Sequence, residues 1–318
     1  MPDTPNTGDP VWERKIIEKL ALETLAEQKR RRRWGIFFKM LGFGYLTFLI
    51  VALGEWGGAT DKLGDGKKHT ALIQLNGVIK QTGEASAEKI TEALQAAFKD
   101  RGTQGVILRI NSPGGSPVQS GIINDEIRRL RSKFPGIPLY AVVEDVCASG
   151  GYYVAAAADK IFVDKASVVG SIGVLMDGFG FTGTMDKLGV ERRLLTAGQN
   201  KGFLDPFSPQ DDQHKQHAQI LLDDIHKQFI DVVRKGRGKR LKESPELFSG
   251  LMWTGAKSIE LGLADELGSV EYVAREVIKA EDILDYTMRA SLTERFARQF
   301  GADMTEGVMN AIGKFWLR

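Results

Sequence analysis

Between residues 70 and 163, short apolar runs alternate with segments whose apolar residues recur at helical spacing. The first pattern predicts strands and the second predicts helices. Strands that alternate with helices of this length indicate βαβ units and a parallel sheet, so the sequence predicts an α/β domain. The expected strands are 71–75, 105–110, 139–143 and 160–163, and the expected helices are 86–99, 118–133 and 149–158.

Composition divides the chain into five parts. Residues 1–33 form an N-terminal segment, 34–56 an apolar stretch, 57–69 a linker rich in glycine and charge, 70–280 the globular domain and 281–318 a C-terminal extension with an amphipathic tail. Within the domain, Ser208-Pro209 predicts a helix start that continues past Val233, because serine caps helices and proline fits their first position. Further helical segments are expected at 255–265 and 270–280.

The apolar stretch 34–56 has about the length that a transmembrane helix needs. It carries one lysine, Lys39, near its basic end, and Trp34 and Trp56 bracket it as interfacial anchors. The basic cluster Lys29–Arg33 directly before it predicts a cytoplasmic N-terminus, with the rest of the chain outside the membrane. A buried core helix and a cleaved signal peptide are the alternatives; the long segment before the stretch favours an uncleaved anchor.

The composition argues against other classes of protein. The 43 Lys and Arg residues against 41 Asp and Glu give a net charge of +2, so the chain lacks the basic surface of a nucleic-acid-binding protein. Cys147 is the one cysteine, so no intrachain disulfide can form. The four histidines form no cluster with cysteine and no HExxH motif, so the sequence predicts no metal site.

Two glycine-bearing turns follow predicted strands. Asn111–Ser116 comes after the strand ending at 110, and Cys147–Gly151 comes after the strand ending near 143. Ligands of open α/β sheets bind at the carboxyl ends of strands, and adjacent glycines let backbone N–H groups approach an oxyanion. The second turn offers Ser149 as a nucleophile, although a plain turn and a helix N-cap remain alternatives for these motifs.

A serine nucleophile needs a general base, and no histidine lies between Thr70 and Lys201. A lysine can act as the base where burial lowers its pKa. Spacing does not select among the lysines near the predicted sheet edge, which are Lys160, Lys165, Lys187 and Lys201. Cys147 is a second candidate nucleophile, although a lone cysteine is usually a small buried apolar residue.

Several motifs in this order and spacing resemble the signal peptide peptidase A family, bacterial membrane peptidases with a Ser/Lys dyad. They are Asn111–Ser116, Ala148–Tyr153, Ala156–Ile161, Gly170–Val174 and the Lys201 loop followed by Pro206–Pro209. The resemblance covers residues 70–280. The combination of these motifs is specific for the family, whereas no single motif is. It implies a Clp protease/crotonase-like fold in its short, single-domain form.

The resemblance implies a role for each matching residue. Ser149 matches the nucleophile, Lys201 the general base and Gly115 a backbone oxyanion donor, with the Gly150 N–H as a second donor. Ser171 matches a hydroxyl that orients the lysine. No cofactor and no metal is implied.

The resemblance also implies partners and a location. The expected substrates are remnant signal peptides and other hydrophobic peptides, and the expected assembly is a homo-octamer in which a neighbouring protomer supplies Lys201. The chain would lie at the bacterial inner membrane, in contact with its lipid, with the catalytic domain on the periplasmic side. Two alternatives remain: a crotonase-like acyl-CoA enzyme, and a non-catalytic membrane assembly protein.

Overall fold

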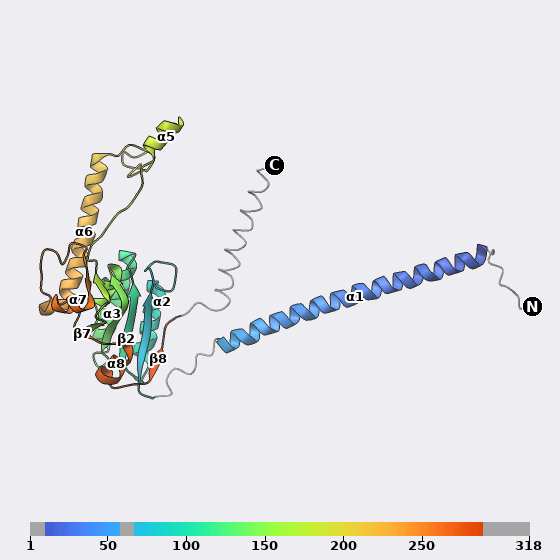
Figure 1. Cartoon of the computed structure of the whole chain (residues 1–318), viewed down its shortest axis with the longest axis horizontal. Coiled ribbons are helices and arrows are strands. Elements are labelled where there is room, and N and C mark those ends of the chain that lie inside the picture. The colour runs from blue at the N-terminus through green and yellow to red at the C-terminus, as the bar shows by residue number, and fades with distance from the viewer. Residues whose placement is uncertain (1–9, 58–66, 289–318) are drawn as a thin grey trace, which may run out of the picture. The chain divides into compact units, whose positions relative to one another are not determined.

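The structure, a computed structural model, describes residues 10–57 and 67–288. It comprises two units, of which the first holds α1 (Pro10–Gly57) and the second spans Lys62–Arg289. α1 is one continuous helix of 48 residues, which joins the apolar stretch to the segment before it (Figure 1). Most of the predicted linker and the tail 291–318 lie outside the described residues.

The predicted membrane span, residues 34–56, lies within α1. Among the helices that the structure describes, none has a stretch long and apolar enough to cross a membrane. The side chains of residues 50–57, where the predicted span ends, are outside the described part. The predicted anchor stays a prediction.

The second unit is built on one mixed sheet, in which eight strands are described, in the order β6-β5-β3-β2-β1-β8 with β4 beside β3 and β7 beside β4. All strand pairs are parallel except β5 with β6. The strands are β1 (His69–Asn76), β2 (Thr103–Ser112), β3 (Leu139–Ala148), β4 (Lys160–Val163), β5 (Val168–Gly170), β6 (Met252–Thr254), β7 (Glu266–Leu267) and β8 (Ile283–Asp285). The mixed α/β sheet confirms the predicted class, whereas the Clp protease/crotonase-like assignment with repeated βαβ units stays an expectation.

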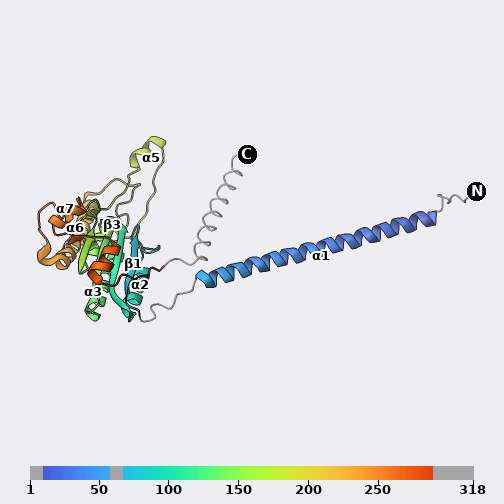
Figure 2. The ribbon, with the colours of Figure 1, turned by 60° about the horizontal axis from the view of Figure 1, so that its bottom comes forward.

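Helices follow most strands and cover the sheet (Figure 2). They are α2 (Ala87–Lys99), α3 (Pro117–Lys133), α4 (Gly150–Ala155), α5 (Thr182–Leu188), α6 (Asp212–Arg237), α7 (Gly255–Glu260) and α8 (Val270–Tyr272), with a 3-10 turn η1 (Gly238–Arg240) and a π-helical turn η2 (Val273–Ile278). The strands and helices predicted between 71 and 163 correspond to β1–β4 and α2–α4.

Both faces of the sheet are buried, because the central strands carry nearly continuous apolar runs and successive side chains point to opposite faces. On one face, Ile73, Leu108 and Ala141 belong to the main core with α2, α3, α4 and α6. On the other face, Ile107 and Phe162 belong to a smaller core with α8 and η2.

The strand β3 branches, and this branching positions the site. Its first half, at residues 140–142, pairs with β4, and its last three residues, 146–148, pair with β5. The carboxyl end of β3 therefore lies between β2 and β5.

The helix α6 extends away from the sheet, and α5 lies beyond its N-terminal end (Figures 1 and 2). Phe229 and Val233 in its C-terminal half are buried in the main core, whereas Ile220 and Leu221 in its N-terminal half are exposed. We call residues 174–211, which include α5, the arm. Its first part, 174–181, has no regular structure.

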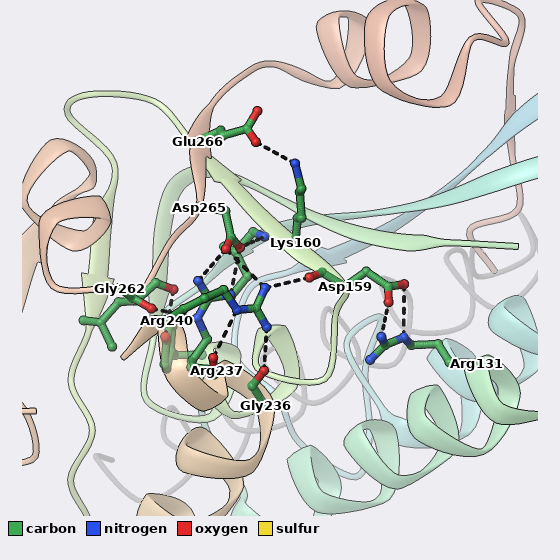
Figure 3. Close-up of polar contacts among 12 residues, drawn as sticks. Arg131, Asp159, Lys160, Gly236, Arg237, Arg240, Gly262, Asp265 and Glu266 are labelled. Atoms are coloured by element: carbon green, nitrogen blue, oxygen red, sulfur yellow. Dashed lines mark hydrogen bonds and ion pairs between the residues drawn. The ribbon is translucent and has the colours of Figure 1, made fainter. Parts of the chain in front are cut away.

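A buried ion pair fixes the C-terminal end of α6 to the sheet (Figure 3). Arg237, whose side chain is 1% exposed, donates to both carboxylate oxygens of Asp265 at 2.8 and 2.9 Å, and to Gly262 O at 2.8 Å. Asp265 also accepts from the backbone N–H of Ile161 in β4 at 2.7 Å and from Arg240 at 3.2 Å.

The predicted start of α6 is wrong by a few residues. The helix begins at Asp212, and Asp211 caps it by accepting from the N–H groups of Gln213 and His214. Ser208 instead donates its hydroxyl proton to the Asp205 carboxylate at 2.7 Å. A carboxylate that accepts two backbone donors outcompetes a serine cap that is engaged elsewhere.

The sheet extends past the predicted domain boundary at residue 280. The strand β8 pairs with β1, and the Tyr286 side chain after it is 5% exposed. Its hydroxyl donates to Asp100 Oδ2 at 2.7 Å and lies 3.0 Å from His69 Nε2. The short β8 carries too little periodic pattern for a sequence-based prediction.

Candidate active site

Ser149 is the one residue between the end of β3 and the start of α4. Its backbone has φ 51° and ψ −121°, which residues other than glycine rarely adopt. Its N–H donates to Gly170 O at 2.8 Å and so ties the turn to β5. Ser149 stands at the N-cap position of α4, and its carbonyl accepts from Tyr153 N at 2.9 Å, but its side chain makes no capping hydrogen bond.

The glycine turn after β2 packs directly against the Ser149 turn. A Cβ atom on Gly114 would lie 2.6 Å from Gly150 N and 2.7 Å from Ser149 Cβ. A Cβ atom on Gly150 would lie 2.5 Å from Ser120 Oγ. A side chain at Gly114 would force the two turns apart, and one at Gly150 would clash with the Ser120 side chain of α3, so both glycines are needed for this packing.

The Gly115 N–H lies beside Gly150. The Gly115 nitrogen is 3.2 Å from the position that a Cβ atom on Gly150 would occupy. Ile79 holds this peptide in place, because its N–H donates to Gly114 O and its carbonyl accepts from Ser116 N, both at 2.8 Å. Two backbone donors on touching turns can stabilise negative charge on a carbonyl oxygen bound near Ser149.

Ser171 is the second cavity residue that has positive φ without being a glycine, with φ 52°. Its N–H donates to Leu251 O at 2.8 Å. The next residue, Ile172, is fully buried, and its carbonyl oxygen lies 3.1 Å from Nε2 of His226 in α6. Hydrogen bonds to Leu251 and to His226 therefore fix the segment that carries Ser171.

Ser149, Gly115, Gly150 and Ser171 line one cavity of about 1030 Å³. Its walls come from α3, α4, α6 and the start of the arm, and most of the lining side chains are apolar. Asp125 in α3 is the one charged side chain among the described residues that line it. The structure thus brings together four of the five predicted site residues.

Lys201, the fifth, is absent from the described lining of this cavity. It is exposed in the arm, in a loop that packs on the start of α6. The neighbouring Asn200 contacts His214 at 3.3 Å, and the Phe203 ring centroid lies 5.3 Å from that of His214. From His214 to Ile225, which lines the cavity, α6 rises by about 17 Å.

Comparison with known proteins decides the family. Residues 131–283 match the model of peptidase family S49, and this segment contains Ser149, Ser171 and Lys201, whereas Gly115 precedes it. An Enterococcus faecium protein assigned as a signal peptide peptidase SppA is 30% identical over 233 residues, which cover 71% of this chain and 67% of that protein. The chain belongs to peptidase family S49. It therefore contains a serine peptidase domain.

Another similar protein is much longer than this chain. A Brucella melitensis protein named Na(+)/H(+) antiporter NhaA is 43% identical over 204 residues, which cover 63% of this chain and 28% of that protein. The chain thus spans less than a third of this relative's length. A solved structure of a mutant membrane-bound stomatin-specific protease with a substrate peptide aligns with a TM-score of 0.45 at 13% identity, covering 74% of this chain and 98% of that chain. A likeness this weak carries no argument.

Within this S49 domain, Cys147 is not a candidate nucleophile. Its side chain is fully buried, and burial raises the pKa of the thiol far above its usual range. A thiol held in its neutral form is a poor nucleophile, so the alternative of a catalytic thiol is wrong.

The walls of the cavity that Ser149 lines were not predicted from the sequence. Val118 and Ile122 are exposed on α3, outside the core-facing stripe that contains Ile123 and Ile127. Apolar residues four apart on a second helix face are a detectable signal for such a wall. His226 and Asp125 gave no such signal, because tertiary packing alone brings them to the site.

Proposed function

We propose that this chain is a serine endopeptidase in which Ser149 is the nucleophile and Lys201 the general base. The Lys201 amine accepts the Ser149 hydroxyl proton while the Ser149 oxygen attacks a peptide carbonyl. The resulting oxyanion accepts hydrogen bonds from the Gly115 and Gly150 N–H groups. The leaving amine takes up the proton, and water activated by Lys201 then hydrolyses the acyl-enzyme and restores Ser149.

The observation that carries this proposal is the junction of the two turns. The strained Ser149 backbone, the Gly115 peptide and Gly150 meet at one end of the cavity. A helix cap or a plain turn requires neither this strain nor this close approach. Ser171 lines the same cavity, and this location supports the proposal that its hydroxyl orients Lys201.

We propose further that Lys201 reaches Ser149 from a neighbouring copy of the chain, within a homo-oligomer such as an octamer. In one chain, Lys201 lies at the far end of α6 from the cavity. The arm that carries it exposes large apolar side chains, among them Phe179 at 77% and Leu195 at 97%. A segment that exposes several large apolar side chains is a candidate for burial against another protein chain.

The proposed substrates are hydrophobic peptides, including remnant signal peptides. Val174, Leu175, Ile225 and Phe229 give the cavity apolar walls that suit such chains. The location at the inner membrane, with the peptidase domain on the periplasmic side, stays a prediction from the basic cluster and the apolar stretch.

The two alternatives are weaker. A crotonase-like acyl-CoA enzyme requires neither Ser149 nor Lys201, and a non-catalytic assembly protein has no reason to retain both. Membership of a peptidase family favours proteolysis over either.

The Ser149→Ala variant tests the proposal. We expect hydrolysis of a hydrophobic fluorogenic peptide to fall at least about a thousandfold, because nucleophile removal leaves only the residual effect of binding and oxyanion stabilisation. A fluorophosphonate probe should add its mass to the Ser149 peptide of the wild type and not to the variant. Ser132→Ala, an exposed serine of α3, is the matched control and should retain full activity. Full activity in Ser149→Ala would reject the proposal.

A further inference from the structure

We propose that Asp125 selects substrates that carry a lysine or arginine side chain three or four residues from the scissile bond. This inference rests on the proposed peptidase function and adds a preference that an apolar cavity alone would not give.

Asp125 lies on the cavity face of α3. Pro117, Val118, Gly121 and Ile122 line the cavity from the same helix, at the spacing that places residues on one helix face. The carboxylate therefore continues an apolar wall that begins beside the Gly115 turn.

The distance along α3 sets the position of the selected side chain. The helix α3 rises by about 12 Å from Pro117, which follows the Gly115 turn, to Asp125. An extended peptide advances about 3.3 Å per residue, so a substrate side chain beside Asp125 is three or four residues from the carbonyl under attack.

The described residues provide no ion-pair partner for Asp125. The nearest cation on α3, Arg128, uses its guanidinium to donate to Asn124 Oδ1 at 2.8 Å and to Val232 O at 3.5 Å. The adjacent Glu126 is paired with Arg129 at 2.6 Å, outside the cavity. Burial lowers the pKa of Arg128 and the Asp125 charge opposes that shift, so the two charges interact although no ion pair joins them. Asp125 therefore remains able to form an ion pair with a cation in the cavity that it lines.

Tyr153 adds a second element that suits a cation. It lines the same cavity, and burial together with the Asp125 charge raises the pKa of its hydroxyl. The Asp125 charge therefore acts on a group that lines the cavity. An aromatic face near a carboxylate attracts lysine and arginine side chains more than either group alone.

Peptide binding tests this inference without depending on catalysis. The Ser149→Ala chain would be titrated with fluorescent alanine–leucine peptides in which one lysine, or norleucine as its neutral counterpart, is moved stepwise along the sequence. We expect the lysine peptide to bind about fivefold tighter at one position, the upper range for a solvent-accessible ion pair. The preference should shrink as salt is raised, because salt screens the pair.

Three variants identify the residue responsible. In the Ser149→Ala background, Asp125→Asn should bring the lysine-to-norleucine ratio close to one, and Asp125→Lys should favour a glutamate peptide instead. Glu126→Gln, the adjacent carboxylate outside the cavity, should leave the ratio unchanged. Equal affinities at every position, no binding of either peptide, or an Asp125→Asn ratio equal to that of the parent would overturn the inference. If the wild type did not cleave these peptides while the Ser149→Ala chain kept the lysine preference in binding, the result would instead count against the proposed function.

Discussion

At the scale of single residues, the cavity depends on two serines with positive φ. Such backbone conformations cost about 1–3 kcal/mol and persist only where neighbouring contacts hold them. Here Gly170 O binds the Ser149 N–H and Leu251 O binds the Ser171 N–H, each at 2.8 Å. The strain at Ser149 therefore opposes stability while it directs the hydroxyl toward the cavity that Ser149 lines.

This strain predicts a difference between two inactive variants. Ser149→Ala removes the hydroxyl but keeps a Cβ atom at φ 51°, whereas Ser149→Gly removes both. We expect Ser149→Gly to unfold in urea with a free energy about 1 kcal/mol higher than that of Ser149→Ala, because glycine adopts this conformation without strain. Gly121→Ala, at a half-buried position in α3 with no atom within 4 Å of the new Cβ, controls for the general effect of the glycine–alanine exchange. Equal stability of the two Ser149 variants would show that the backbone there is unstrained.

The close packing of the Gly115 and Ser149 turns was predictable from the sequence for a physical reason. The carboxyl ends of the parallel neighbours β2 and β3 must meet at one sheet edge, so the turns that follow them had to lie close together. No such rule links Lys201 to Ser149, and only the family resemblance selected it from four lysines. Asp125 and His226 were beyond prediction, because their neighbours are set by how α3 and α6 pack.

At the scale of elements, α6 connects the sheet to the arm. Its start was predicted three residues early, and its C-terminal anchor at Arg237 and Asp265 had no signal in the sequence, since the two residues come from separate elements. The arm itself lacks the periodic apolar pattern that predicts helices or strands. Elements that are buried on one face, such as α2 and α3, were predicted within a residue or two at each end.

The anchor predicts a specific dependence of stability on pH. Burial raises the pKa of Asp265, but the hydrogen bonds and charge of Arg237 outweigh it and hold the pKa below its ordinary value of 3.8. A carboxyl whose folded pKa is lowered stabilises the fold fully above its unfolded pKa, and this contribution is lost as the pH falls through the folded pKa. Asp265→Asn should therefore lower the free energy of unfolding by about 3 kcal/mol at pH 7, because Arg237 is left buried without its counter-charge.

The difference between wild type and Asp265→Asn should narrow once the pH falls below 3.8, because the Asp265 carboxyl then takes up protons in the unfolded chain before it does so in the folded one. Urea unfolding at a series of pH values measures this. Asp224→Asn, at an exposed carboxylate on α6, the helix that carries Arg237, should show little effect at any pH. A difference that stays constant down to the lowest pH would mean that the Asp265 charge does not provide the stabilisation.

At the scale of the whole molecule, the cavity that Ser149 lines lies beside the middle of α6, whereas the loop that carries Lys201 lies at the N-terminal end of α6. This separation makes sense if the active unit is a ring of copies in which each arm reaches a neighbour's cavity. Such contacts are heterologous, so every protomer would give its Lys201 to one neighbour and receive a lysine from another. The exposed apolar side chains of the arm would then be buried between copies.

Mixing two inactive variants tests this arrangement. Alone, Ser149→Ala and Lys201→Ala should each be inactive, the first without a nucleophile and the second without a base. In an equimolar mixture that exchanges subunits freely, a site is complete when an intact Ser149 meets an intact Lys201 from the next copy, which random assembly gives at about a quarter of the sites. Peptidase activity should therefore recover to about a quarter of the wild-type value. Mixed oligomers verified by native mass spectrometry that remain inactive would show that each chain must supply both residues, and that the arm has to fold back onto its own cavity.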